Sequence, residues 1–448
     1  MGSLFGTDGI RGSANVELTP ELALSLGRSL IELLRGQGNE RPAVIIGRDP
    51  RWSGEMLESA LVAGITSAGG DARTVGVLPT AAVAHLTARS AAAAGAMISA
   101  SHNPVGDNGI KFFGADGFKF SDDDEARLEA LIDEAAASPR PRGTEIGRRL
   151  ADPSAVARYI EYLASVVDLD LAGLKVVVDG ANGAASSVAP QVYRQLGADV
   201  ITIHCSPDGA NINAGCGSTY PDVIAAAVIE HGADLGISHD GDADRLIAAT
   251  ATGAEVDGDV ILAILAKHLH ERGALRQGAV VTTVMTNLGF RRAMSALGIE
   301  VIETTVGDRY VLAAMRERGL NLGGEQSGHL IDLEHATTGD GILSAVLLMA
   351  VVHETGASLD ELATVMQRLP QVLVNVKDVD RSRLDGAGQV WAAVKQIEDE
   401  LGGGGRVLLR PSGTEPVVRV MIEAPELDQA QQIADNLATV VAAALAVH

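Results

Sequence analysis

A short apolar run that ends in a polar turn, GAMISASHNP from Gly95 to Pro104, is the unit from which the fold of this chain can be predicted. Its first four residues are typical of a buried strand. Proline fixes its own backbone angle and restricts the residue before it, so Pro104 indicates a stiff turn directly after the strand. Ser101 lies in that turn, which can aim its hydroxyl as a nucleophile requires. A turn capped by its own side chains has the same pattern, so this stretch alone leaves both interpretations open.

Strands and helices alternate in the residues that precede this turn. We expect strands at residues 43–47 and 72–77, and helices at residues 53–68 and 80–93. Strands separated by helices of about a dozen residues are typical of a mostly parallel sheet covered by helices. The first part of the chain therefore predicts an α/β domain with Ser101 at the end of one strand.

A second unit begins with LKVVVDGANG, from Leu174 to Gly183. The pattern predicts a buried strand, a glycine-rich turn and a helix that ends near residue 196, with further strands at 199–203 and 235–238. The glycine spacing differs from Gly-x-Gly-x-x-Gly, so we infer no dinucleotide site. We expect these glycines to allow close packing of the strand and the helix.

The remaining chain predicts two more units. The third has expected helices at 259–271 and 288–297, and expected strands at 279–285 and 300–305. The last is expected to read strand, helix, strand, strand, helix at residues 371–376, 388–401, 406–410, 417–424 and 427–447. Units of this size are typical of domains. We therefore predict four domains, at residues 1–150, 151–252, 253–368 and 369–448.

Composition narrows the class of protein. The chain has 448 residues, 46% of them apolar, which is enough for large cores. Its formal charge of −23 argues against nucleic acid or an anionic membrane as a partner, so an anionic substrate would need a local basic site. Two cysteines, and no basic leader before an apolar stretch, favour a cytoplasmic location.

An acidic loop follows the predicted strand at 235–238. It reads HDGDADR from His239 to Arg245, so carboxylates alternate with small residues and can turn toward one point. Oxygen ligands at this density suit Mg²⁺. The loop is too short for a calcium-binding EF-hand and has Ala251 where that motif needs a glutamate. A solvated acidic turn is the alternative interpretation.

Two further loops predict ligand binding. RPSGTEP, from Arg410 to Pro416, supplies an arginine, two hydroxyls and a glycine amide, which suit a phosphate but also occur in ordinary hairpin turns. GGEQSGH, from Gly323 to His329, presents donors and acceptors of the kind that sugar hydroxyls need. Within it we rank His329 below the carboxylate and the hydroxyl, because a lone histidine is more often structural.

The N-terminal segment and the residues after Ser101 add cations. FGTDGIRG, from Phe5 to Gly12, carries three glycines and Arg11. Lys111 follows Ser101 by ten residues, which predicts a shared site, with a surface lysine as the alternative.

These five loops, in this order, resemble those of the α-D-phosphohexomutase superfamily over essentially the whole chain. The N-terminal FGTDGIRG, GDRYV from Gly307 to Val311, Gln326 and TTGDG from Thr337 to Gly341 are most similar to its bacterial phosphoglucosamine mutases. The resemblance implies an α/β fold of four domains around a central cleft: three related mixed α/β sandwich domains, and a smaller, mobile α+β C-terminal domain.

The resemblance also implies an isomerase that interconverts glucosamine 6-phosphate and glucosamine 1-phosphate for peptidoglycan precursors. The reaction would proceed through a phosphoserine at Ser101 and a sugar 1,6-bisphosphate. One Mg²⁺ per subunit would be held by the phosphoserine and by Asp240, Asp242 and Asp244. The transfer site would be lined by Arg11, His102, Lys111 and Arg245, with the general acid and base left open. Substrate binding would fall to Gly324, Glu325, Ser327, His329, Asp308, Arg309, Arg410, Ser412, Gly413 and Thr414.

Other functions remain open at this point. A phosphomannomutase or phosphoglucomutase would apply the same chemistry to a sugar without an amine, whereas Asp308 favours an amino sugar because a carboxylate attracts an ammonium. A phosphatase with Asp240 as nucleophile would leave Ser101 and the Arg410 loop without a role. A sugar-phosphate-binding regulator would need few of the reactive groups. We expect a small-molecule sugar phosphate as partner, no nucleic acid and no membrane, with a homodimer as a possible assembly.

Overall fold

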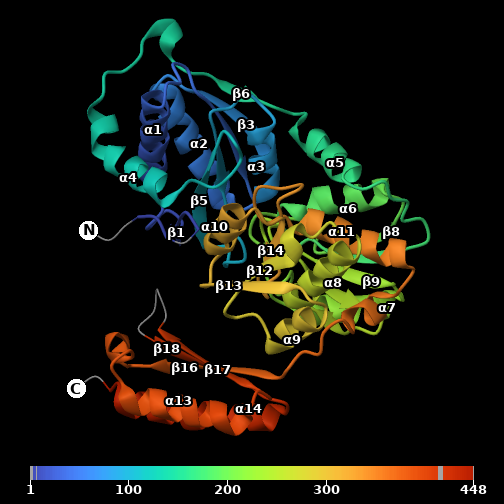
Figure 1. Ribbon diagram of the computed structural model, residues 1–448. Helices are drawn as coiled ribbons and strands as arrows, with labels where there is room; N and C mark the ends of the chain where they lie inside the picture. The colour runs from blue at the N-terminus through green and yellow to red at the C-terminus, as the bar shows by residue number, and fades with distance from the viewer. Residues whose placement is uncertain (1–3, 7, 412–416, 447–448) are drawn as a thin grey trace. The chain divides into compact units, whose positions relative to one another are not determined.

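The computed structural model describes residues 4–6, 8–411 and 417–446. Within these residues the strands form four sheets, of six, five, four and three strands (Figure 1). The chain divides into two compact units, one of Met1–Val284 with Ile299–Thr364, and one of Met285–Gly298 with Val365–His448. None of the helices in the described part is long and apolar enough to cross a membrane.

The first sheet has the order β1-β5-β4-β2-β3-β6. Its strands are β1 (Ile10–Ser13), β2 (Ala43–Arg48), β3 (Asp71–Val77), β4 (Ala94–Ile98), β5 (Asp107–Gly114) and β6 (Arg149–Ala151). Strands β4, β2, β3 and β6 are parallel, as the alternating pattern predicts, whereas β5 runs antiparallel to both β4 and β1. The sequence analysis had no strand at β5. This strand turns the chain back along β4 and pairs Lys111 with Met97.

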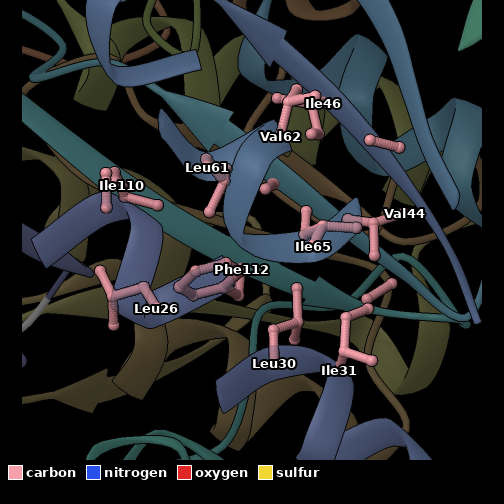
Figure 2. Packing of buried hydrophobic residues seen from close by; sticks show 14 of the residues in the cluster. Leu26, Leu30, Ile31, Val44, Ile46, Leu61, Val62, Ile65, Ile110 and Phe112 are labelled. Carbon is pink, nitrogen blue, oxygen red and sulfur yellow. The ribbon is translucent and has the colours of Figure 1, made fainter. Parts of the chain in front are cut away.

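Helices α1 (Pro20–Gly36), α2 (Trp52–Ser67), α3 (Thr80–Ala88) and α4 (Asp122–Ala137) accompany this sheet. Helices α1 and α2 contribute apolar residues at helical spacing, which gives each helix a face that can be buried. Figure 2 shows these side chains packed against residues of β2 and β5: Leu26, Leu30, Ile31, Leu61, Val62 and Ile65 against Val44, Ile46, Ile110 and Phe112. This core holds β4 and β5 in place, and with them the turn after β4 that carries Ser101 and the middle of β5, which carries Lys111.

The second sheet has the order β11-β10-β9-β7-β8. Its strands are β7 (Lys175–Asp179), β8 (Asp199–Ile203), β9 (Leu235–Ser238), β10 (Ile247–Thr250) and β11 (Glu255–Val256), with helices α5 (Ala155–Ser165), α6 (Ala185–Gln195) and α7 (Pro221–His231). Strands β8, β7 and β9 are parallel, so their carboxyl ends meet at one edge. The acidic loop leaves β9 at this edge.

The third sheet has the order β13-β12-β14-β15. Its strands are β12 (Ala279–Thr283), β13 (Glu300–Thr304), β14 (Leu322–Gly324) and β15 (Leu330–Asp332), with helices α8 (Gly258–Glu271), α10 (Asp308–Arg318), α11 (Gly341–Thr355) and α12 (Leu359–Ala363). The loop from Glu325 to His329 is the connection of the β14–β15 hairpin.

The other compact unit is built on an antiparallel sheet of order β16-β18-β17. It contains α9 (Leu288–Ala296), β16 (Gln371–Lys377), α13 (Gly388–Leu401), β17 (Arg406–Pro411), β18 (Val417–Glu423) and α14 (Leu427–Ala444). The carboxylate of Glu423 is fully buried; it accepts from the backbone N–H of Leu288 at 3.0 Å and pairs with Arg406 at 2.9 Å. A carboxylate at the N-terminus of a helix is stabilising. The contact between Glu423 and Leu288 also joins α9 to the sheet of this unit.

Candidate active site

Ser101 lies in a tight turn after β4, as the sequence predicts, and is 1% exposed. Its φ of 52° is in the left-handed region, which a serine adopts only when the surrounding structure holds it there. The backbone N–H of Ser101 donates to Ser99 Oγ at 3.0 Å. Its carbonyl oxygen accepts from Arg51 Nη2 at 3.0 Å and from Asn213 Nδ2 at 2.9 Å. The turn is therefore held from both sides of the serine.

Arg51 is the side chain that organises this turn, and the sequence analysis did not single it out. It is fully buried, and its Nε donates to Asp49 Oδ2 at 2.9 Å. Asp49 also accepts from Ser99 Oγ at 2.6 Å. The remaining guanidinium donors reach four backbone carbonyls, those of Ser101, Asn103, Pro104 and Asp107. The only signal in the sequence was a short charged segment, RDPR, directly at the end of a strand.

The three aspartates of the acidic loop are all buried beside Ser101. Ser101 Oγ donates to Asp240 Oδ2 at 2.5 Å. Gly241 allows this approach, because a Cβ added there would lie 2.5 Å from the carbonyl oxygen of Ser101. Burial, and then the charges of Asp244 and Asp242, raise the pKa of Asp240 well above its usual range.

The acidic loop fits a divalent cation. Carboxylate oxygens of Asp240, Asp242 and Asp244 lie within 4.8 Å of one another. The Oδ1 atoms of Asp242 and Asp244 are buried and have no hydrogen-bond partner among the described residues. Buried carboxylate oxygens without donors are costly unless a cation meets them. The donor set, all oxygen, is the one that Mg²⁺ prefers.

Lys111 is 2% exposed, so the alternative of a surface lysine is wrong. Its Nζ lies 2.8 Å from Asp8 Oδ2, 3.2 Å from Asp242 Oδ2 and 3.6 Å from Asp244 Oδ2. Burial alone would lower the pKa of this ammonium, but Asp242, Asp8 and Asp244 raise the pKa above its usual value. Lys111 is therefore a buried cation at neutral pH.

Three more predicted residues lie near the Ser101 turn: His102, Arg11 and Arg245. His102 Nδ1 lies 3.3 Å from Ser101 Oγ. Burial, followed by Arg245 and Arg11, lowers the pKa of His102 to about 4, so its ring is neutral at pH 7. Arg11 pairs with Asp8, and the backbone N–H of Arg245 donates to Asp240 Oδ1 at 3.2 Å. In the described part of the chain, the Nε atoms of both arginines are buried without a hydrogen-bond partner, which suits binding of an anion.

His329 belongs to this cluster too, although the sequence analysis ranked it low. It is 4% exposed; its Nδ1 lies 3.6 Å from Asp244 Oδ2, and its Nε2 lies 3.7 Å from Asp308 Oδ2. Burial alone would lower the pKa of His329, but Asp244 and Asp308 raise it. Asp308 also pairs with Lys119, a residue that no sequence motif identified.

The other residues of the predicted substrate site are less closely grouped. Glu325 Oε1 accepts from the backbone N–H of Gly307 at 3.1 Å, Gly324 is buried at the end of β14, and Ser327 is exposed. Arg309 is directed to α4, where it pairs with Asp122 and Glu125. The structure therefore does not place Arg309 with the Ser101 cluster.

In the C-terminal unit, Arg410 on β17 lies opposite Arg419 on β18. Burial, and then Arg419, lowers the pKa of Arg410, and Arg410 Nε is buried with no hydrogen-bond partner among the residues that the structure describes. Two adjacent arginines of this kind favour an anion. The other predicted phosphate ligands, Ser412, Gly413 and Thr414, lie outside the described residues.

Comparisons with known proteins agree with this arrangement. Four models of the phosphoglucomutase/phosphomannomutase family match the chain: alpha/beta/alpha domain I at residues 2–138, domain II at 157–253, domain III at 257–369, and the C-terminal domain at 373–440. A solved structure of a family protein from Burkholderia thailandensis has a TM-score of 0.83 at 25% identity, covering 99% of this chain and 97% of that one. N-acetylphosphoglucosamine mutase from Aspergillus fumigatus, solved with GlcNAc-6P and magnesium, has a TM-score of 0.69 at 19% identity, covering 98% and 95%. Fold and site together define a phosphohexomutase.

Full-length relatives identify the family of this chain within the phosphohexomutases. The phosphoglucosamine mutase of Streptomyces avermitilis is 55% identical over 451 residues, covering 99% of this chain and all of the relative. That of Thermobifida fusca is 55% identical over 450 residues, covering both chains completely. The chain belongs to the phosphoglucosamine mutase family and is an isomerase of the mutase type.

Proposed function

We propose that this chain interconverts glucosamine 6-phosphate and glucosamine 1-phosphate, with Ser101 as the carrier of the phosphoryl group. The observation that carries the proposal is the 2.5 Å contact of Ser101 Oγ with Asp240, inside a buried cluster of carboxylates and cations. The full-length relatives, which are phosphoglucosamine mutases, support the reaction and the substrate.

We propose that Asp240, Asp242 and Asp244, with an oxygen of phosphorylated Ser101, hold one Mg²⁺. This ion would neutralise charge on the transferring phosphoryl group. A divalent cation would offset the negative charge of the three buried carboxylates and of the phosphoryl group, as a buried site requires. The buried Oδ1 atoms of Asp242 and Asp244, which have no hydrogen-bond partner in the part of the chain that the structure describes, support the same assignment.

Phosphoryl transfer breaks the bond between Ser101 Oγ and phosphorus and forms a bond from a sugar hydroxyl oxygen to phosphorus. The hydroxyl proton passes to a base of the site, and the Ser101 oxygen takes up a proton as its bond to phosphorus breaks. Transfer of the other phosphate from the sugar 1,6-bisphosphate back to Ser101 completes the cycle. Arg11, Lys111 and Arg245 would offset the charge of the phosphoryl oxygens, and such positioning and charge neutralisation are what this chemistry requires.

Lys111 and His329 are the two candidates for exchanging the proton. Both are buried within 3.6 Å of Asp244 Oδ2, on different domains of the sequence prediction. His329 Nε2 has no hydrogen-bond partner among the described residues; Asp308 Oδ2 lies 3.7 Å from it, beyond hydrogen-bond distance. His102, which is neutral and touches Ser101 Oγ, would orient that oxygen.

Glu325, with Gly324 and Ser327, is proposed to hold sugar hydroxyls at the tip of the β14–β15 hairpin. The non-reacting phosphate is proposed to bind Arg410, Ser412, Gly413 and Thr414. The adjacent Arg410 and Arg419 support an anion site on that sheet. The four predicted domains, a homodimer and a cytoplasmic location stay predictions.

A phosphomannomutase or phosphoglucomutase differs from this proposal only in the sugar. Asp308 was expected to attract the substrate ammonium. In the structure Lys119 already pairs with Asp308, so an amine would share this carboxylate with a protein cation. A change in the ratio of amino-sugar to neutral-sugar activity in Asp308→His would support a role in selection, and an unchanged ratio would remove it.

The proposal is tested by a Mg²⁺-dependent mutase assay with a trace of sugar bisphosphate, comparing glucosamine 6-phosphate, glucose 6-phosphate and mannose 6-phosphate. We expect preference for the amino sugar, a phosphopeptide containing Ser101, and loss of both turnover and phosphopeptide in Ser101→Ala. Ser59→Ala, a change at an exposed serine of α2, is the matched control. Preference for a neutral sugar would correct the proposed substrate and leave the proposed mechanism unchanged. Release of free phosphate that survives Ser101→Ala would refute the mechanism.

A further inference from the structure

Six side chains around the transfer site form a closed ring in which acidic groups alternate with basic groups. In order, they are Asp244, Lys111, Asp8, Lys119, Asp308 and His329. Each of the six has a side chain less than 20% exposed. The ring therefore lies in an environment where charges act on one another strongly.

The two groups proposed to exchange the proton, Lys111 and His329, are joined by two routes through this ring. The short route is Asp244, whose Oδ2 is 3.6 Å from each of them. The long route starts at Asp8, which lies 2.8 Å from Lys111, and ends at Asp308, which lies 3.7 Å from His329.

Lys119 is the link in the long route. Its Nζ lies 2.5 Å from Asp8 Oδ1 and makes a closer contact with Asp308 Oδ2. Burial alone would lower the pKa of Lys119, but Asp308 and Asp8 raise it, so the side chain is a cation. An isolated β-bridge between Phe113 and Lys119 holds the backbone here, directly after β5.

The ring joins distant parts of the sequence. Asp8 precedes β1, and Lys111 and Lys119 lie on or directly after β5. Asp308 is the first residue of α10. The residue before it, Gly307, donates its backbone N–H to Glu325 Oε1. Lys119 therefore connects β5, which carries Lys111, to the first residue of α10, which lies next to the contact with Glu325.

We propose that Lys119 is a positioning residue for phosphoryl transfer: it holds Asp8 against Lys111 and Asp308 against His329. The inference rests on the proposed function, because Lys111 and His329 matter only if they face the reacting phosphate. Without the ammonium, Asp8 and Asp308 lose their shared partner, and each carboxylate can turn away from the group it orients. A displacement of the reacting groups by about 1 Å can lower the reaction rate about 10²-fold.

The test compares Lys119→Met, Lys119→Arg and Lys267→Met in the full-length enzyme with glucosamine 6-phosphate. Lys267 is 44% exposed on α8 and pairs only loosely with Glu271, so its variant controls for the loss of a lysine. We expect kcat to fall about 10- to 100-fold in Lys119→Met, with KM changed less than about threefold. Lys119→Arg should recover most of the loss, since it restores a cation between the two carboxylates. Lys119→Gln serves the same comparison if the methionine variant does not fold.

A double-mutant cycle with Asp308→Asn shows whether Lys119 acts through Asp308. We expect the double variant to be no slower than the slower single variant, because residues that act through one contact are not additive. Wild-type kcat in a folded Lys119→Met, failure of arginine to restore activity, or additive effects would each overturn the inference. Wild-type activity and the Ser101 phosphopeptide are measured in the same series, so a failure of the proposed function is seen separately.

Discussion

Arg51 shows how one residue can control a reactive group that it does not touch directly. Its guanidinium has donors in a fixed planar fork, and five of its contacts reach Asp49 and the carbonyls around Ser101. The chain Arg51–Asp49–Ser99 then ends on the backbone N–H of Ser101. The strained φ of Ser101 persists because these contacts hold both of its peptide groups.

We therefore expect Arg51→Lys to lower kcat at least about tenfold, with a smaller change in KM. A lysine keeps the charge but cannot reach four carbonyls, and each buried carbonyl left without a donor costs about 1–3 kcal/mol. Steady-state kinetics and the thermal unfolding midpoint measure the two effects. Arg41→Lys, at a partly exposed pair with Asp71, is the control. Wild-type kinetics in Arg51→Lys would show that the Ser101 turn keeps its conformation without the guanidinium of Arg51.

At the scale of elements, the pair α1 and α2 depends on two glycines that face each other. A Cβ added at Gly64 would lie 2.2 Å from the carbonyl oxygen of Leu24, and one at Gly27 would lie 2.5 Å from that of Leu61. The two helix backbones therefore approach more closely than any side chain allows. This approach brings their leucines and isoleucines onto the sheet that carries Ser101 (Figure 2).

Gly64→Ala should destabilise the protein by about 1–3 kcal/mol, because the added methyl meets backbone that cannot move without separating the helices. Gly36→Ala is the matched control at the end of α1, where an added Cβ has nothing within 4 Å. There alanine should be neutral or stabilising by up to about 1 kcal/mol, as its helix propensity predicts. Urea unfolding of both variants measures these changes in the free energy of unfolding. Equal midpoints for the two would contradict the packing argument.

At the scale of the molecule, the acidic loop, the Ser101 turn and the β14–β15 hairpin come from separate sheets. Ser101 meets Asp240, and His329 of the hairpin meets Asp244, in one buried cluster. Three carboxylates held together repel one another, so a bound cation should stabilise the folded state and have little affinity for the unfolded chain.

We expect the thermal unfolding midpoint to rise with Mg²⁺ concentration after treatment with a chelator, and to saturate. Stabilisation reaches about 2.7 kcal/mol when the ion is at 100 times its dissociation constant. Asp242→Asn should reduce this rise, whereas Asp399→Asn, at a side chain 68% exposed, should keep it. An equal rise in all three proteins would place the ion elsewhere.

Much of this protein was readable from sequence. Apolar runs at β2, β4, β7 and β9 predicted the strands, because burial on both faces requires continuous apolar residues. The loops after them indicated Ser101 and the aspartates, since polar residues with glycine or proline at a strand end form turns. These patterns are local. The sizes of the predicted units, and then a resemblance over the whole chain, led to the prediction of four domains.

Other features were decided only by the tertiary structure. Strand β5, the burial of Lys111 and the roles of Arg51, Asp8 and Lys119 have no local pattern. The contacts of Arg51 with Ser101, of Lys111 with Asp242 and of Lys119 with Asp8 and Asp308 span 50 to 189 residues of sequence. A charged side chain in a sequence predicts a solvated surface. Here the fold surrounds such side chains with opposite charges, and that compensation, which only three-dimensional proximity supplies, keeps them buried at the site.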